Sequence, residues 1–128
     1  MSLSLPTLID DSPTFRTHEG VRESISAACA QHSDVASFEE LGPSEDGQML
    51  YGVTLGTGDQ TVSLIAGNHA DEPVGPETLR TFVLSALANR DKMAPWFRRF
   101  QFVIVPHTNP DGEGRNRRWI EKWPDPKA

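Results

Sequence analysis

The chain has 128 residues, of which 37% are hydrophobic and 23% charged, and it carries a formal net charge of −6. That length accommodates one domain, or the front part of a larger one, with a buried core. The acidic balance excludes a nucleic-acid binder, which needs a broad basic face, and the lack of any apolar run near ~18 residues excludes a membrane span.

The first part of the chain predicts a lead-in, a helix and two strands. Residues 1–16 are polar and rich in turn-forming residues, so we expect an extended lead-in before a folded domain at 17–128. Apolar residues recur at helical spacing over 17–32 and predict an amphipathic helix. A strand is expected over 35–41, and the regular alternation over 49–55 predicts a second strand.

The central part of the chain predicts a strand–helix–strand unit. Residues 57–60 indicate a tight hairpin connection, and the apolar run 61–66 is typical of a strand covered on both faces. An amphipathic helix is expected over 74–88, followed by a polar stretch at 89–93 and a further buried strand at 100–105. The two strands that flank the helix should run parallel.

Cysteine usage bears on the cellular compartment. Cys29 is the only cysteine, so the chain has no partner for an internal disulfide, which fits a reducing environment. The opening residues contain neither the basic segment nor the long apolar stretch of a secretory signal. We therefore expect a cytoplasmic protein.

The side chains with the most chemistry follow the two parallel strands. Sites in open α/β sheets form beyond the carboxyl ends of such strands, where 67–72 and 106–112 lie. His69 and Glu72 offer an imidazole nitrogen and a carboxylate oxygen, which zinc accepts as ligands. Gly67 allows the backbone to turn sharply there. The alternative is a surface histidine beside a glutamate that complements a helix dipole.

A second group of candidates follows the later strand. Asn109 begins the sequence NPDG, which by itself predicts an ordinary turn. Arg115, Arg117 and Arg118 then form a local basic patch in an acidic chain. One or two of these guanidiniums would clamp a carboxylate or polarise a carbonyl, and the alternative is a solvated basic loop.

Together these segments resemble a known family. The sequence AGNHADEPVG at 66–75, followed by a strand and by NPDGEGRNRRW at 109–119, is similar to the zinc carboxypeptidases (peptidase M14) and their aspartoacylase and succinylglutamate desuccinylase relatives. The resemblance covers about residues 35–123. It implies an α/β fold, the N-terminal part of a mixed-sheet, three-layer domain in which a β-hairpin precedes a parallel βαβ unit.

The resemblance also implies roles for the candidate residues. In this family the histidine and glutamate of the H-x-x-E motif bind one zinc ion, which makes His69 and Glu72 metal ligands. An arginine after the NPDG turn polarises the scissile carbonyl, and this catalytic role is assigned to Arg117. Substrate binding is assigned to three residues, of which the two arginines are also rivals for the catalytic role: Asn109, Arg115 and Arg118.

The sequence departs from the family pattern in two ways. Asp71 stands where many pancreatic-type members carry an arginine. Family members take their third zinc ligand, a histidine, and their general-base glutamate from segments that would follow Ala128, so we expect a truncated domain. His107, close to the end of a strand, is a candidate substitute ligand, whereas we expect His18 and His32 on a helix surface.

The expected function is the hydrolysis of C-terminal peptide bonds by metal-activated water, in a domain that is incomplete here. Two alternatives stay open. One is an N-acyl amino acid amidohydrolase of the aspartoacylase or desuccinylase type, and the other is a catalytically inactive fragment or binding module. The expected partner of either enzyme is a peptide or an acyl amino acid with a free carboxylate.

Overall fold

The structure, a computed structural model, describes residues 14–117 and residue 121. The expected lead-in at 1–16 therefore lies mostly outside the described residues. The elements in chain order are α1 (His18–Ala30), β1 (Ala36–Pro43), β2 (Met49–Leu55), β3 (Gln60–Ile65), α2 (Val74–Ala88), α3 (Arg90–Arg99), β4 (Phe100–Val105) and α4 (Pro110–Arg115).

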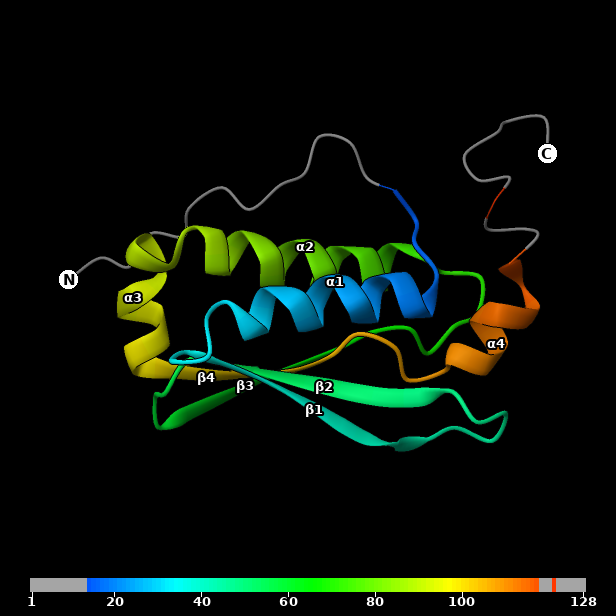
Figure 1. The fold of residues 1–128 in the computed structure, drawn as a ribbon, viewed down its shortest axis with the longest axis horizontal. Helices are drawn as coiled ribbons and strands as arrows, with labels where there is room; N and C mark the ends of the chain where they lie inside the picture. Colours follow the sequence, from blue (N-terminus) through cyan, green and yellow to red (C-terminus); the bar gives the residue numbers. More distant parts are fainter. Residues whose placement is uncertain (1–13, 118–120, 122–128) are drawn as a thin grey trace.

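The strands of the described residues form one mixed sheet in the order β1-β2-β4-β3. β1 and β2 pair antiparallel, as do β2 and β4, whereas β3 and β4 run parallel with Ile65 opposite Val105. α1 and α2 lie side by side on one face of this sheet (Figure 1). The prediction of an α/β fold with a mixed sheet and a parallel βαβ unit is confirmed.

Helix α1 forms because its sequence supplies both a cap and an apolar stripe. The Thr17 hydroxyl accepts a hydrogen bond from the Gly20 amide at 3.0 Å and satisfies an N–H of the first turn. Val21, Ile25 and Cys29, each four residues apart, are buried in the core.

Burial raises the pKa of the Cys29 thiol to about 11, so the thiol stays protonated at neutral pH.

The connection at 57–60 is not the tight hairpin that its turn residues predicted. β4 lies between β2 and β3, so these two strands are not partners in the sheet. The hairpin of the fold joins β1 to β2 instead, where the Ser44 amide donates to the Gln48 carbonyl at 2.7 Å. Turn chemistry indicates where a chain reverses, but the core decided the partners, because Phe102 and Ile104 of β4 are buried.

The expectation that β3 is covered on both faces is also wrong. β3 lies at the edge of the described sheet, its residues alternate between exposed and less exposed positions, and Ile65 is 61% exposed. β4, in contrast, has a strand on each side. An uninterrupted apolar run therefore identified a strand correctly without fixing its place in the sheet.

Helix α3 was not expected, because the polar stretch at 89–93 hides its start. Met93 and Phe97 are one helical turn apart, and both are buried. Pro95 lies inside this helix, although proline usually ends one by removing an N–H donor. Packing of the two buried side chains against the core outweighs the weak local preference for a helix.

The core lies between the sheet and the helices. Buried apolar side chains come from both layers, with α1, α2 and α3 on one side and the central strands β2 and β4 on the other. None of the helices in the described part of the chain has the length and hydropathy needed to cross a membrane.

Candidate functional site

The loops that follow β3 and β4 are joined at the carboxyl ends of these strands. The Thr108 amide donates to the Ala66 carbonyl at 3.1 Å, and the Asn109 amide donates to the Gly67 carbonyl at 2.9 Å. The parallel pairing thus continues into the loops. The two segments that the sequence placed beyond the strand ends lie together, as the rule for parallel strands predicts.

Gly67 makes the turn after β3. Its φ is +74°, in the left-handed region that favours glycine. A Cβ atom here would lie 2.9 Å from both the Cα atom of His107 and the carbonyl oxygen of Pro106. Glycine at this position therefore permits both the left-handed backbone conformation and the close approach of the two loops.

His69 and Glu72 share one turn, in which the Glu72 amide donates to the His69 carbonyl at 3.2 Å. Both residues are exposed, and within the described residues neither side chain forms a hydrogen bond or an ion pair. A free imidazole and a free carboxylate on one turn fit the ligand preferences of zinc. Among residues 14–117 and 121, no cluster of three His, Cys, Asp or Glu side chains is placed to hold a metal.

Asn109 caps helix α4, because its Oδ1 atom accepts a hydrogen bond from the Gly112 amide at 3.0 Å. Its Nδ2 atom donates to the Asn68 carbonyl at 3.2 Å. The NPDG sequence, expected as an isolated turn, is therefore the first turn of a short helix, and Pro110 occupies a position where a missing N–H costs nothing. Isolated turns and the first turns of helices favour the same residues, so the tetrapeptide alone could not distinguish between these two structures.

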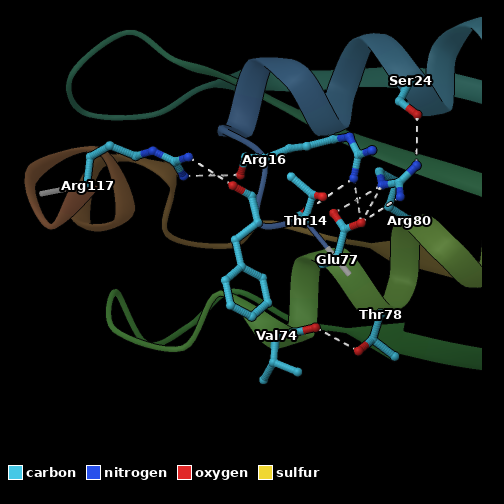
Figure 2. Close-up of polar contacts among 9 residues, drawn as sticks. Thr14, Arg16, Ser24, Val74, Glu77, Thr78, Arg80 and Arg117 are labelled. Carbon is cyan, nitrogen blue, oxygen red and sulfur yellow. Dashed lines mark hydrogen bonds and ion pairs between the residues drawn. The ribbon is translucent and has the colours of Figure 1, made fainter. Parts of the chain in front are cut away.

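Arg117 contacts the segment that precedes α1. Its guanidinium donates to the main-chain carbonyls of Phe15 and Arg16 at 2.9 and 3.3 Å (Figure 2). The same guanidinium lies 3.0 Å from the carboxylate of Glu113, which is 7% exposed. These contacts tie the C-terminal side of α4 to the start of the described chain.

Arg115 has a different environment from Arg117. Its side chain is 68% exposed and pairs with Asp46 in the loop between β1 and β2, whereas the Arg117 side chain is 23% exposed. Arg118, the third candidate arginine, lies outside the described residues. Of the two candidate arginines that the structure describes, Arg115 is the more accessible to a ligand.

A buried charged cluster on α2 was not predicted. Glu77 accepts hydrogen bonds from Arg80, the shortest at 2.5 Å, and from Arg16 at 2.6 Å (Figure 2). Arg80 also contacts Ser24 of α1 at 3.4 Å. Burial of a charge requires a partner, and here the buried Glu77 carboxylate is paired with two guanidiniums. The spacing of Glu77 and Arg80, three residues apart on one helix, could have predicted this ion pair from the sequence.

The expectation that His18 lies on a helix surface is wrong, because this residue is 3% exposed. His18 precedes Val21 by three residues and Ile25 by seven, so it belongs to the same buried stripe of α1. The helical spacing indicated a buried position for His18, but the prediction followed the general tendency of histidine to be exposed. His32, the other histidine expected at the surface, is half-buried.

His18 packs against His107, the candidate substitute ligand. The ring centroids are 5.1 Å apart with nearly perpendicular planes, and the Tyr51 ring lies 5.5 Å from that of His18. His18 Nε2, Tyr51 Oη and His107 Nδ1 are buried without a hydrogen-bond partner within the described chain. Burial lowers the pKa of both histidines, that of His107 to about 3, so both rings are neutral at pH 7.

A separate apolar groove of about 400 Å³ lies between β3 and α2. Leu64, Ile65, Val74 and Leu79 contribute to its lining. Neither His69 nor Glu72 lines it, so the groove is distinct from the candidate metal ligands.

Comparison with known proteins supports one family. Residues 21–124 match the family model described as zinc carboxypeptidase. An uncharacterised protein of Zymomonas mobilis subsp. mobilis is 31% identical over 97 residues, which cover 66% of this chain and 26% of that protein. Carboxypeptidase B of Astacus astacus is 25% identical over 105 residues, which cover 80% of this chain and 35% of that protein.

A solved structure supports the fold. Bovine thrombin-activatable fibrinolysis inhibitor, in complex with tick carboxypeptidase inhibitor, matches with a TM-score of 0.75 over 87% of this chain and 36% of its own. At 20% sequence identity this likeness shows the fold alone. The present chain spans about a quarter to a third of the length of the two curated relatives.

Proposed function

Because this chain belongs to the zinc carboxypeptidase family, we propose that its strand-end site is the metal-binding part of a peptidase that hydrolyses C-terminal peptide bonds. The observation that carries the proposal is the pair of exposed, unengaged side chains of His69 and Glu72 on one turn. Bound zinc would supply a Lewis acid that polarises the substrate carbonyl. His69 would hold the metal through its neutral imidazole and Glu72 through its carboxylate.

Two arginines of the described chain are proposed to contact the substrate. The exposure of Arg115 supports binding of a free carboxylate, for which a guanidinium offers two parallel donors. Arg117, which the family resemblance assigns to the carbonyl, would have to exchange its hydrogen bonds to Phe15 and Arg16 for the substrate. We therefore favour Arg115 as the first substrate contact.

We propose a peptide with a free C-terminal carboxylate as the substrate, because the relative from Astacus astacus is named a carboxypeptidase. A catalytic zinc site normally has three protein ligands, and two are proposed among the described residues. We therefore propose that the 128-residue chain alone binds zinc without turnover. The acyl amino acid alternative uses the same groups, and no observation favours it.

A cytoplasmic location is proposed from the single cysteine, Cys29.

Zinc binding by the purified 128-residue chain, measured in competition with a chromophoric chelator, tests the metal site. We expect one zinc ion per chain for the wild type and loss of binding for His69→Ala and Glu72→Ala. The variant His32→Ala is the matched control, because it removes a histidine outside the site. An unchanged affinity in His69→Ala, or no binding by the wild type, would contradict the proposed metal site.

Turnover is tested separately. The zinc-loaded chain is incubated with blocked dipeptides and with N-acyl amino acids, with and without a chelator. We expect no hydrolysis of either substrate class. Chelator-sensitive hydrolysis by this chain would contradict the proposed lack of turnover, and the preferred substrate would then decide between a peptidase and an amidohydrolase.

A further inference from the structure

Two asparagine side chains hold the backbone on either side of His69. The Asn109 Nδ2 atom donates to the carbonyl of Asn68 at 3.2 Å, and the Asn116 Nδ2 atom donates to the carbonyl of Ala70 at 3.0 Å. The two accepting carbonyls therefore belong to the residues directly before and directly after His69. The two donors are the residues that cap α4 at its N-terminal and C-terminal ends.

We propose that Asn109 and Asn116 are positioning residues that hold the His69 turn in the conformation that binds zinc. The inference rests on the proposed function, because it assigns a purpose to the turn only if His69 is a metal ligand. It also changes the expected role of Asn109, which family resemblance placed in substrate binding. Both polar atoms of the Asn109 amide are engaged, Oδ1 with the Gly112 amide and Nδ2 with the Asn68 carbonyl.

The two asparagines act from a helix that is itself anchored. Asp111 in α4 accepts a hydrogen bond from the Ser44 hydroxyl at 2.6 Å and one from the Asp46 amide at 3.1 Å. Gln48 adds a hydrogen bond from its Nε2 atom to the Pro110 carbonyl at 3.2 Å. The loop between β1 and β2 therefore fixes α4, and α4 in turn fixes the loop that carries His69.

The His69 turn needs such support because it has few other restraints. Within the described residues, the side chains of His69 and Glu72 make no polar contact, and the turn between them is closed by one main-chain hydrogen bond of 3.2 Å. Thr108 adds a contact one residue earlier, where its hydroxyl is hydrogen-bonded to the Asn68 side chain. Mutation of groups that hydrogen-bond directly to metal ligands typically changes metal affinity by about 10–100-fold. Asn109 and Asn116 would act through the backbone on either side of the ligand, so we expect an effect at the lower end of this range.

The test compares Asn116→Ala and Asn116→Asp with Asn89→Ala in the full chain. Asn116→Asp keeps the shape of the side chain but replaces the amide donor with an acceptor. Asn89→Ala is the matched control, because Asn89 is also half-buried and donates through Nδ2 to a carbonyl, that of Ser85 at 2.9 Å, on the distant end of α2. Amide hydrogen exchange over residues 67–72 is measured without metal, and zinc affinity by chelator competition.

We expect both Asn116 variants to exchange faster over 67–72 and to bind zinc about tenfold more weakly. Asn89→Ala should leave both quantities at their wild-type values, even if its thermal midpoint falls as far as that of Asn116→Ala. The inference is overturned if exchange over 67–72 is unchanged in the Asn116 variants, or if their zinc affinity equals that of Asn89→Ala. Wild-type protein that binds no zinc while exchange responds as expected would reject the proposed metal site and leave only a structural clamp.

Discussion

The Glu77 carboxylate lies 2.5 Å from the Arg80 guanidinium on α2, and their side chains are 5% and 7% exposed. Arg16 contributes a further charge at 2.6 Å from a side chain that is 36% exposed. This cluster holds the segment before α1 against α2 (Figure 2). Replacing Glu77 removes a buried carboxylate that accepts hydrogen bonds from two guanidiniums, which costs much more than removing an exposed pair.

We expect Glu77→Ala to lower the free energy of unfolding by about 3 kcal/mol. The matched control is Glu19→Ala, which removes a pair of the same spacing with Arg22, in which the Glu19 side chain is 55% exposed. The control should cost less than ~1 kcal/mol. Urea denaturation of both variants measures the difference, and equal costs would contradict the prediction.

Arg117→Ala should destabilise the protein more than Arg115→Ala does. Loss of Arg117 leaves the buried Glu113 carboxylate without its partner at 3.0 Å and removes two hydrogen bonds to main-chain carbonyls. We expect a cost of about 2 kcal/mol, against less than ~0.5 kcal/mol for the exposed pair of Arg115 with Asp46. Thermal unfolding of both variants provides the measurement, and the reverse order would disprove a structural role for Arg117.

Gly67→Ala should cost more stability than Gly47→Ala. Both glycines have positive φ, +74° and +82°, so both substitutions carry the same conformational penalty of roughly 1–2 kcal/mol. Only at Gly67 would the new Cβ atom meet main-chain atoms at 2.9 Å, since nothing lies within 4 Å at Gly47. The excess cost, about 1–3 kcal/mol, reports the close approach of the two loops and is measured by urea denaturation. Indistinguishable variants would mean that the loops are farther apart.

Stability should fall as the pH decreases below about 6.5. Burial lowers the pKa of His107 from 6.5 to about 3, so between these values the unfolded chain binds a proton that the folded chain does not. The stabilisation is therefore complete above the unfolded pKa and is lost as the pH falls toward the folded one. The neighbouring His18 acts in the same direction, because burial lowers its pKa as well.

The variant His107→Leu tests this pH dependence. It should remove a loss of about 3 kcal/mol between pH 7 and pH 4, measured by urea denaturation at several pH values. His32→Leu, which replaces a half-buried histidine outside the pair, is the control variant. An identical slope in His107→Leu and wild type would show that other groups produce the acid sensitivity.

Several parts of the site could be predicted because they depend on neighbours along the chain. The φ of Gly67 agrees with the expected sharp turn, and His69 and Glu72 do share one turn. The place of these residues beyond a parallel strand followed from the alternation of strand, helix and strand. The functional roles of the ligands and arginines stay predictions that the variants above test.

Other parts of the site were inaccessible from local patterns. Asn109 and Asn68 are 41 positions apart, and Arg16 and Glu77 are 61 apart, yet each pair forms a hydrogen bond. Nothing in the sequence near Asn116 indicates that its amide reaches Ala70. Such contacts exist only after the helices have packed on the sheet.

By itself, the sequence determined where α1, α2 and the four strands form, which loops follow the parallel strands, and which side chains there have the chemistry of metal ligands. These properties depend on backbone preference and on apolar spacing within a few residues. The tertiary structure decided the position of β4 between β2 and β3, the burial of His18 against His107, and the two asparagine contacts around His69. The reason is physical, because burial and long-range hydrogen bonds are properties of the packed core and of no single segment.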